Sequence, residues 1–243
     1  MKERPILFKG EMVRAILEGR KTQTRRVVKE ACPTWDRIFC DELTGCATIG
    51  VYADDGSRVR GDKFVCPYGK KGDRLWVRET WKVGAWRDGG QIAVDYKASP
   101  DLGRTPWCFP PRDKFAKLAA QSFEDCETAF DNDDPNIWEG EKPGMAFMWE
   151  VGNSPCRVRP SIHMPRWASR IDLEVTGVRV ERVQDITEDD AREEGICDSH
   201  PEGCCDGDCI NTCWRVLWDS INKARGFGWS VNPWVWVVEF KRI

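Results

Sequence analysis

The sequence predicts an α+β fold on two observations. Apolar and polar residues alternate over 74–81, 171–183 and 234–242, and this period of two is typical of half-buried strands. Apolar residues recur at helical spacing over 12–17 and 210–221, which predicts amphipathic helices. Because strand and helix patterns both recur along the chain, we expect helices packed against a sheet.

The first predicted helix leads into a cationic run. Its apolar stripe ends before Gly19, and we expect the helix to end there because glycine readily adopts the left-handed conformation. The run that follows contains Arg20, Lys21, Thr22, Gln23, Thr24, Arg25 and Arg26. A phosphate-binding loop is excluded, because that motif has Gly directly before Lys and a strand before the loop. The run is therefore either a solvated surface or a functional site.

The segment 74–81 predicts a strand that carries one buried carboxylate. Alternation places Glu79 on an apolar face, and such a group needs a cationic partner; we expect Arg25 or Arg26. Tryptophans lie within a few residues of arginines here and further on, namely Trp76 and Trp81 beside Arg78, and Trp167 beside Arg166 and Arg170. Such pairs stack nucleobases or pack in the core.

The segment 84–160 is rich in Asp, Gly and Pro and predicts one amphipathic helix, with Phe115, Leu118, Ala119 and Phe123 at helical spacing. The strand at 171–183 is followed by a short helix. Thr187 is its expected N-cap and Asp190 completes a capping box. This helix ends at Gly195, so Glu194 lies at its C-terminal end.

A cysteine-rich segment follows Gly195. Its candidate metal ligands are Cys197, His200, Cys204, Cys205, Cys209 and Cys213. Cys209 and Cys213 are four residues apart and share one helix face, so we favour a structural zinc ion. An iron–sulfur cluster and unligated thiols are the alternatives.

Composition limits the class of protein. The chain has 243 residues, 41% hydrophobic residues and a net charge of −3, so any nucleic-acid contact is expected from a local patch. It has no apolar run of about 20 residues and no signal-peptide core at its start. We therefore expect a cytoplasmic protein with no membrane partner, whose 12 cysteines do not form a disulfide framework.

Four stretches resemble a known family. ILEGRKTQTRRV resembles the opening signature of ASCH-domain proteins, specifically their prophage-type members. The later stretches are CPYGKKGDRLWVRETW from Cys66, RPSIHMPRWASRI from Arg159 and WSVNPWVWVVEFKRI from Trp229. The resemblance implies a PUA-like mixed β-barrel with flanking short helices. We expect a single domain over 1–243, with a large insertion at 84–160 and a Cys-rich insertion at 197–213.

The resemblance also implies an activity. Small bacterial members of this family are amidohydrolases that remove the acetyl group from N4-acetylcytidine with a lysine, a threonine and a glutamate. Their Gly-Arg-Lys-Thr-x-Thr pattern is matched here with Lys21 and Thr24. Their Leu-Thr-Glu-x-x-Ala-x-x-Glu pattern is matched by ITEDDAREE, with Ile for Leu, at Glu194. Those enzymes have less than half this length, so the extra segments here could cover or reshape the pocket.

The implied chemistry is self-consistent. We expect Lys21 and Glu194 to share a proton, with like-charged arginines lowering the pKa of Lys21, and Thr24 to position water or bind the carbonyl oxygen. No cofactor is required. The predicted substrate-binding residues are Arg20, Arg25, Arg26, Trp76, Arg78, Glu79, Trp81 and Trp167. This hypothesis requires Glu194 within hydrogen-bond reach of Lys21.

Three other interpretations stay open. The chain is alternatively a noncatalytic module that binds single-stranded RNA, with cations on phosphates and tryptophans on bases. It is alternatively a ribonuclease, or the three residues are an ordinary Lys–Glu surface pair with a strand threonine. The expected partner is accordingly a modified nucleoside or single-stranded RNA.

Overall fold

The computed structural model contains two compact units. It describes residues 1–29, 38–41, 44–49, 51–52, 58–60, 63–87, 89–99, 107–140, 146–196 and 209–243. The first unit comprises Met1–Arg4, Ala15–Leu75 and Asp172–Ile243, and the second comprises Pro5–Arg14 and Trp76–Ile171. Each unit is described by itself below.

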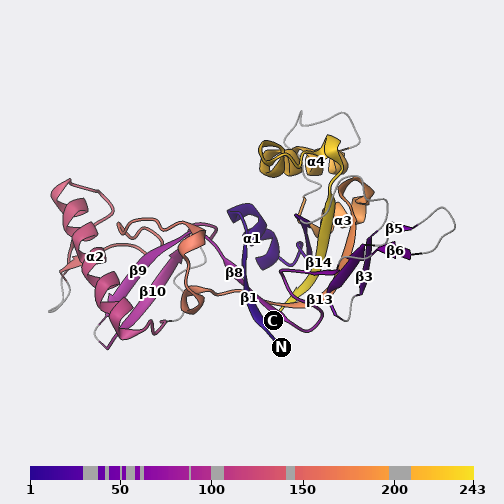
Figure 1. Ribbon diagram of the computed structural model, residues 1–243. Helices are drawn as coiled ribbons and strands as arrows, with labels where there is room; N and C mark the ends of the chain where they lie inside the picture. The colour runs from indigo at the N-terminus through magenta and orange to yellow at the C-terminus, as the bar shows by residue number, and fades with distance from the viewer. Residues whose placement is uncertain are drawn as a thin grey trace. The chain divides into compact units, whose positions relative to one another are not determined.

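The main sheet has the strand order β1-β8-β13-β14-β2. Its strands are β1 (Glu3–Leu7), β2 (Gln23–Val27), β8 (Arg74–Arg78), β13 (Asp172–Arg182) and β14 (Trp234–Arg242). The long strands β13 and β14 run antiparallel and side by side (Figure 1), and β2 pairs antiparallel with β14. These pairings bring the cationic run next to the C-terminal strand, which is more than 200 residues away in the sequence.

Smaller sheets and short helices complete the first unit. One sheet has the order β3-β4-β7 and another pairs β5 with β6. Their bounds are β3 (Ile38–Asp41), β4 (Cys46–Ile49), β5 (Val51–Tyr52), β6 (Arg58–Arg60) and β7 (Lys63–Val65). The helices are α3 (Glu188–Glu193), α4 (Cys209–Asn222) and the 3₁₀ turns η4 (Val183–Asp185), η5 (Lys223–Arg225) and η6 (Trp229–Val231). Three elements are divided between the two units, namely α1 (Gly10–Leu17), β1 and β8.

The α+β class is confirmed, but the predicted closed barrel is not found in the described residues. Their strands form separate sheets, and the main sheet has β1 and β2 at its two edges. A barrel requires a ladder of hydrogen bonds between the edge strands, and no pairing of β1 with β2 occurs in these ranges.

Apolar residues of β14 pack the helices of the first unit onto the sheet. Val235 and Val237 of β14 form a buried cluster with Ala191 of α3 and with Trp214 and Trp218 of α4. The alternation of β14 therefore directs one apolar face toward α3 and α4, and this contact places the end of α3 over the sheet.

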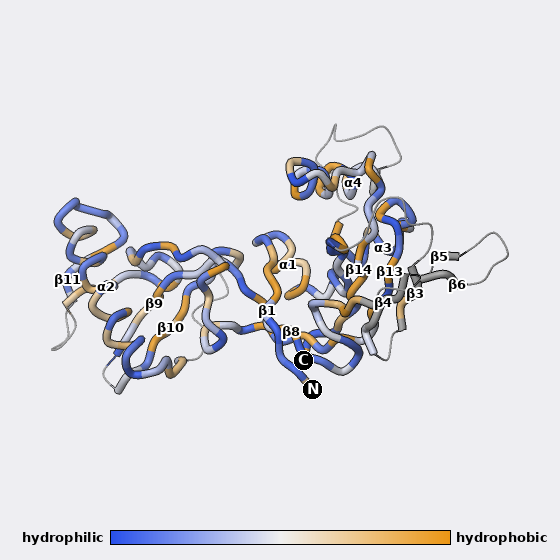
Figure 2. Tube along the Cα trace, in the orientation of Figure 1, coloured by the Kyte–Doolittle hydropathy of each residue, from blue (hydrophilic) through white to orange (hydrophobic). Residues whose placement is uncertain are grey.

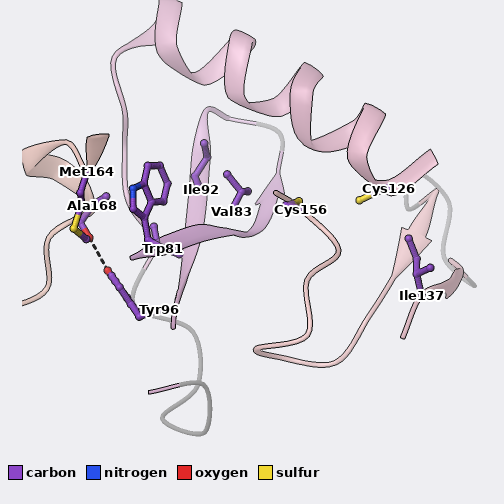
Figure 3. Close-up of a cluster of buried hydrophobic side chains, with 10 residues drawn as sticks. Trp81, Val83, Ile92, Tyr96, Cys126, Ile137, Cys156, Met164 and Ala168 are labelled. Carbon is purple, nitrogen blue, oxygen red and sulfur yellow. Dashed lines mark hydrogen bonds between the residues drawn. The ribbon is translucent and has the colours of Figure 1, made fainter. Parts of the chain in front are cut away.

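The second unit is built around a β-hairpin and a long helix. Its elements are β9 (Trp81–Arg87), β10 (Gln91–Tyr96), α2 (Arg112–Asp131), β11 (Trp138–Glu139), β12 (Phe147–Met148), η2 (Ser161–His163) and η3 (Arg166–Ala168). β10 carries a hydrophobic stretch (Figure 2) that includes the buried Ile92 and Val94. These residues pack with Trp81, Tyr96 and Met164 (Figure 3). The described residues of the predicted insertion at 84–160 all lie in this unit.

Most predicted elements are confirmed, with one strand divided. The predictions over 171–183 and 234–242 correspond to β13 and β14, and the predicted helices to α1, α2, α3 and α4. The predicted strand over 74–81 is instead two strands, β8 and β9, with Glu79 and Thr80 between them. The reason is that the backbone of Trp81 changes partner and pairs with Arg159, through hydrogen bonds of 3.1 and 2.7 Å. No helix in the described ranges is long and apolar enough to cross a membrane.

We predict that Leu173→Ala lowers the free energy of unfolding by about 2 to 5 kcal/mol, because deletion of a buried side chain loses transfer energy and leaves a cavity. Leu173 of β13 is 0% exposed. The control is Val216→Ala, since Val216 of α4 is 64% exposed and its truncation should change the free energy by less than about 0.5 kcal/mol. Chemical denaturation of both variants measures the difference, and equal values would contradict this description of the core.

Candidate active site around Lys21 and Glu194

The register of the main sheet gathers charged residues on one face. Arg25 of β2 lies opposite Val237 of β14, which lies opposite Arg179 of β13. Cross-strand partners point to the same side of a sheet, as do residues two apart in a strand. Gln23 and Glu181 therefore share this face, which is the one that α3 and α4 cover.

Lys21 lies in the turn between α1 and β2. Gly19 adopts the left-handed conformation with φ of 77° and ends the helix, after which the amide of Lys21 donates to the carbonyl of Ala15 at 3.0 Å. The backbone of Lys21 then forms an isolated bridge with Glu194. This turn directs the lysine side chain toward the C-terminal end of α3.

The ammonium of Lys21 is buried and bound to Glu194. Its Nζ donates to Glu194 Oε2 at 2.6 Å, to the Glu194 carbonyl at 2.8 Å and to the Gln23 carbonyl at 2.8 Å. The side chains of Lys21 and Glu194 are 0% and 2% exposed. All three donors of a lysine ammonium therefore have acceptors, and the interpretation as a surface pair is wrong.

Burial lowers the pKa of Lys21. Desolvation is the largest cause; the charge and hydrogen bond of Glu194 act in the opposite direction, and the charges of Arg26 and Arg25 lower the pKa further. The arginine effect expected from the sequence is thus present for these two residues but secondary. Arg20 instead lies at the surface, where it binds Glu18 at 2.5 Å and the Gly195 carbonyl at 3.0 Å.

Arg25 contacts three carboxylates. Its guanidinium binds Glu181 Oε1 at 2.5 Å, Asp190 Oδ2 at 3.1 Å and Glu194 Oε1 at 3.4 Å. The side chain is completely buried, and its Cζ lies 5.9 Å from the ring centroid of Trp214. The predicted role of Arg25 as a substrate-binding residue is not supported, because its hydrogen-bonding groups are directed to protein carboxylates.

Gln23 and Arg179 extend this network. Gln23 Nε2 donates to Asp190 Oδ1 at 2.8 Å and to the Asp190 carbonyl at 3.0 Å. Arg179 binds Glu181 at 3.1 Å, Asp190 at 2.9 Å and also Glu239. None of the polar residues Gln23, Arg179, Glu181 and Glu239 was predicted from the sequence to belong to this supporting network. The signal was present, since polar residues at every second position of an otherwise apolar strand share a face.

Thr24 is not joined to Lys21 and Glu194 by a hydrogen bond. It alternates with Gln23 and Arg25 along β2, so its side chain points to the other face of the sheet, opposite Val238 of β14. Thr24 is buried, and within the described ranges no hydrogen bond reaches its hydroxyl.

The other predicted substrate-binding residues are mostly in packing contacts. Glu79 is buried and binds Arg170 through two bonds of 2.9 Å, so the expectation of Arg25 or Arg26 as its partner is wrong. Trp81 is 2% exposed and packs edge-on against Trp167, with centroids 5.8 Å apart. A buried indole has no face free for a base, so this geometry gives Trp81 a packing role.

Three further predicted substrate-binding residues, Arg78, Trp76 and Arg26, take part in contacts between an arginine and an aromatic ring. Arg78 lies 4.7 Å from the ring centroid of Trp76, which is 8% exposed. Arg26 Cζ lies 5.9 Å from the ring centroid of Tyr68. These cation–π contacts lie inside the respective units and cover the aromatic faces.

The predicted metal site falls largely outside the described residues. Cys197, His200, Cys204 and Cys205 lie there, as does the side chain of Cys209, while Cys213 is half-buried on α4. In the described part of the chain no group of three or more His, Cys, Asp or Glu residues is arranged to hold a metal ion. The zinc hypothesis stays a prediction.

Comparison of the chain with protein-family models, with curated proteins and with solved structures finds no match.

Gly195 keeps the end of α3 close to Lys21. Its φ is 90°, and a Cβ added there would lie 2.8 Å from Ala15 Cβ and 3.2 Å from Lys21 Cβ.

We predict that Gly195→Ala is more destabilising than Gly19→Ala. Both place alanine in a left-handed conformation, at about 1 to 2 kcal/mol, but a Cβ on Gly19 meets nothing within 4 Å. Thermal unfolding of the two variants measures the difference in their stability, which is the cost of the contact between the added Cβ and its neighbours. Equal decreases in melting temperature would contradict the close approach.

The Asp190 carboxyl predicts acid sensitivity. Burial by itself raises the pKa of Asp190, but hydrogen bonds from Gln23 and Thr187 and the charge of Arg25 outweigh it and lower the pKa. A carboxyl whose pKa is lowered by folding stabilises the protein above the pKa of the unfolded state, and this stabilisation is lost as the pH falls through the pKa of the folded state.

We predict that the free energy of unfolding decreases when the pH is lowered past about 4, and that Asp190→Asn makes this decrease smaller.

Asp189→Asn is the matched control for this measurement, because Asp189 lies on the same helix and its side chain is 91% exposed. Urea unfolding over a series of pH values should give the same acid dependence for Asp189→Asn and wild type. If Asp190→Asn also matched wild type, the network would not stabilise the ionised carboxylate.

Proposed function

We propose that this chain is an amidohydrolase, related to ASCH-domain proteins of the PUA-like superfamily, that acts on an acylated cytidine such as N4-acetylcytidine. The observation that carries the proposal is the buried pair of Lys21 Nζ and Glu194 Oε2, 2.6 Å apart. These two positions are those at which the sequence resembles the lysine and glutamate of the family's enzymes. Their side chains come from segments 173 residues apart, and the fold brings them into contact.

The electrostatics of the pair suit acid–base chemistry. Desolvation lowers the pKa of Lys21, which favours the neutral amine, and Glu194 is in position to exchange a proton with it. In the proposed reaction, water attacks the acyl carbon while the pair takes its proton. The C–N bond then breaks, and the same proton passes to the leaving N4 nitrogen, giving cytidine and acetic acid, which releases the second proton of the water to solvent and becomes acetate. This sequence uses no cofactor.

The charge arrangement favours this function over an RNA groove. Arg25 is buried and directed to carboxylates, and Arg20 is paired with Glu18. Binding to an RNA backbone depends on protein cations that neutralise phosphates and displace the counterions condensed on the RNA. An arginine that is already paired with protein carboxylates contributes little to such binding. The site is therefore better suited to an uncharged amide.

We predict that the purified protein releases cytidine from N4-acetylcytidine, and that Lys21→Ala and Glu194→Gln each reduce kcat by about 100-fold or more, the usual scale for loss of a general acid or base. Chromatographic separation of cytidine from substrate measures turnover.

Two variants test whether the hydroxyl of Thr24 takes part. If it does, Thr24→Val should reduce kcat and Thr24→Ser should retain most of it, whereas equal rates for both variants would assign Thr24 a packing role.

Folded wild-type protein that leaves an excess of N4-acetylcytidine and related acylated cytidines unchanged would reject the amidohydrolase proposal. Fluorescence anisotropy with labelled single-stranded RNA then tests the binding-module alternative, and cleavage of the same RNA tests the ribonuclease alternative.

A further inference from the structure

Arg25 connects Glu194 to the rest of the first unit. Glu194 has two carboxylate oxygens, of which Oε2 accepts from Lys21 at 2.6 Å and Oε1 faces Arg25 NH1 at 3.4 Å. Each oxygen therefore has its own cation. Rotation of the carboxylate about its terminal bond would move both oxygens away from these cations, and Arg25 opposes it by binding one oxygen.

Arg25 is itself rigidly held. Its Nε and NH2 both donate to Glu181 Oε1, at 2.9 and 2.5 Å, and NH2 also lies 3.1 Å from Asp190 Oδ2. The two anchors come from β13 and from α3. Because a guanidinium is planar with donors in a fixed fork, these bonds determine where NH1 points.

We propose that Arg25 is a positioning residue of the active site, which holds the Glu194 carboxylate so that Oε2 stays directed at Lys21. This inference rests on the proposed function for its catalytic consequence. Its structural content, the coupling of Arg25 to the Lys21–Glu194 pair, is independent of any substrate. Arg25 acts through Glu194 and does not touch the reacting atoms.

Arg179 provides the matched control. It shares Glu181 and Asp190 with Arg25, but within the described part of the chain its side chain makes no hydrogen bond to Lys21 or Glu194. Arg25→Lys and Arg179→Lys each keep a positive charge and lose the fork geometry. We expect kcat to fall about 10-fold or more in Arg25→Lys, as misplacement of a reacting group does, with KM changed less than about two-fold, and kcat to stay within about three-fold in Arg179→Lys.

Two measurements test the inference without turnover. Burial lowers the pKa of Lys21, the charge and hydrogen bond of Glu194 raise it, and the charges of Arg26 and Arg25 lower it further. Arg25→Gln removes one of these charges, so the midpoint of the Lys21 NMR titration should move to higher pH. The midpoint should stay near the wild-type value in Arg25→Lys, which keeps the charge. The carboxyl carbon resonance of Glu194 should shift in Arg25→Lys and stay unchanged in Arg179→Lys.

These readouts separate the two proposals. An inactive wild-type protein with the expected resonance shifts would reject the amidohydrolase and keep the coupling. Wild-type kcat in Arg25→Lys, or equal losses in Arg25→Lys and Arg179→Lys, would reject Arg25 as a positioning residue. Removal of a buried cation among carboxylates can prevent folding, and Arg25→Gln is therefore the less robust variant. If it does not fold, the carboxyl carbon resonance of Glu194 in Arg25→Lys tests the inference, and an unchanged resonance would overturn it.

Discussion

The candidate site depends on the burial of one ammonium group against one carboxylate. Taking either charge out of water alone costs several kcal/mol, and the pair is tolerated only with good geometry and satisfied hydrogen bonds. Both conditions hold, since Lys21 has three acceptors and Glu194 meets a cation at each oxygen. The turn at Gly19, the end of α3 and the sheet beneath them must all be formed before these contacts exist.

The same electrostatic constraint explains the polar face of the main sheet. Arg25 and Arg179 are placed between Glu181, Asp190 and Glu194, and Gln23 fills the space beside Asp190. Buried charges of one sign would be unstable without the other. The opposite charges of the network therefore neutralise one another. These ion pairs bind α3 to β2 and β13, and apolar contacts bind it to β14.

The second unit shows how a similar local pattern serves another purpose. Glu79 is a buried carboxylate with an arginine partner, as Glu194 is, but its two bonds to Arg170 are a symmetric ion pair. Tryptophans beside arginines in this unit pack in its core or lie under guanidinium groups. Proximity in sequence therefore did not distinguish a binding surface from a packed interior, because the exposure of each indole depends on distant residues.

The local elements of this protein could be predicted from residues that are close together in the chain. Alternation specified β13 and β14, a capping box specified the start of α3, and a glycine specified the end of α1, because each depends on residues within one or two turns of chain. The contact of Lys21 with Glu194 was a requirement of the hypothesis that the family resemblance implied. The partners of Arg25, Glu79 and Trp81 could not be predicted in this way, because sheet register and strand pairing are non-local and set which side chains meet.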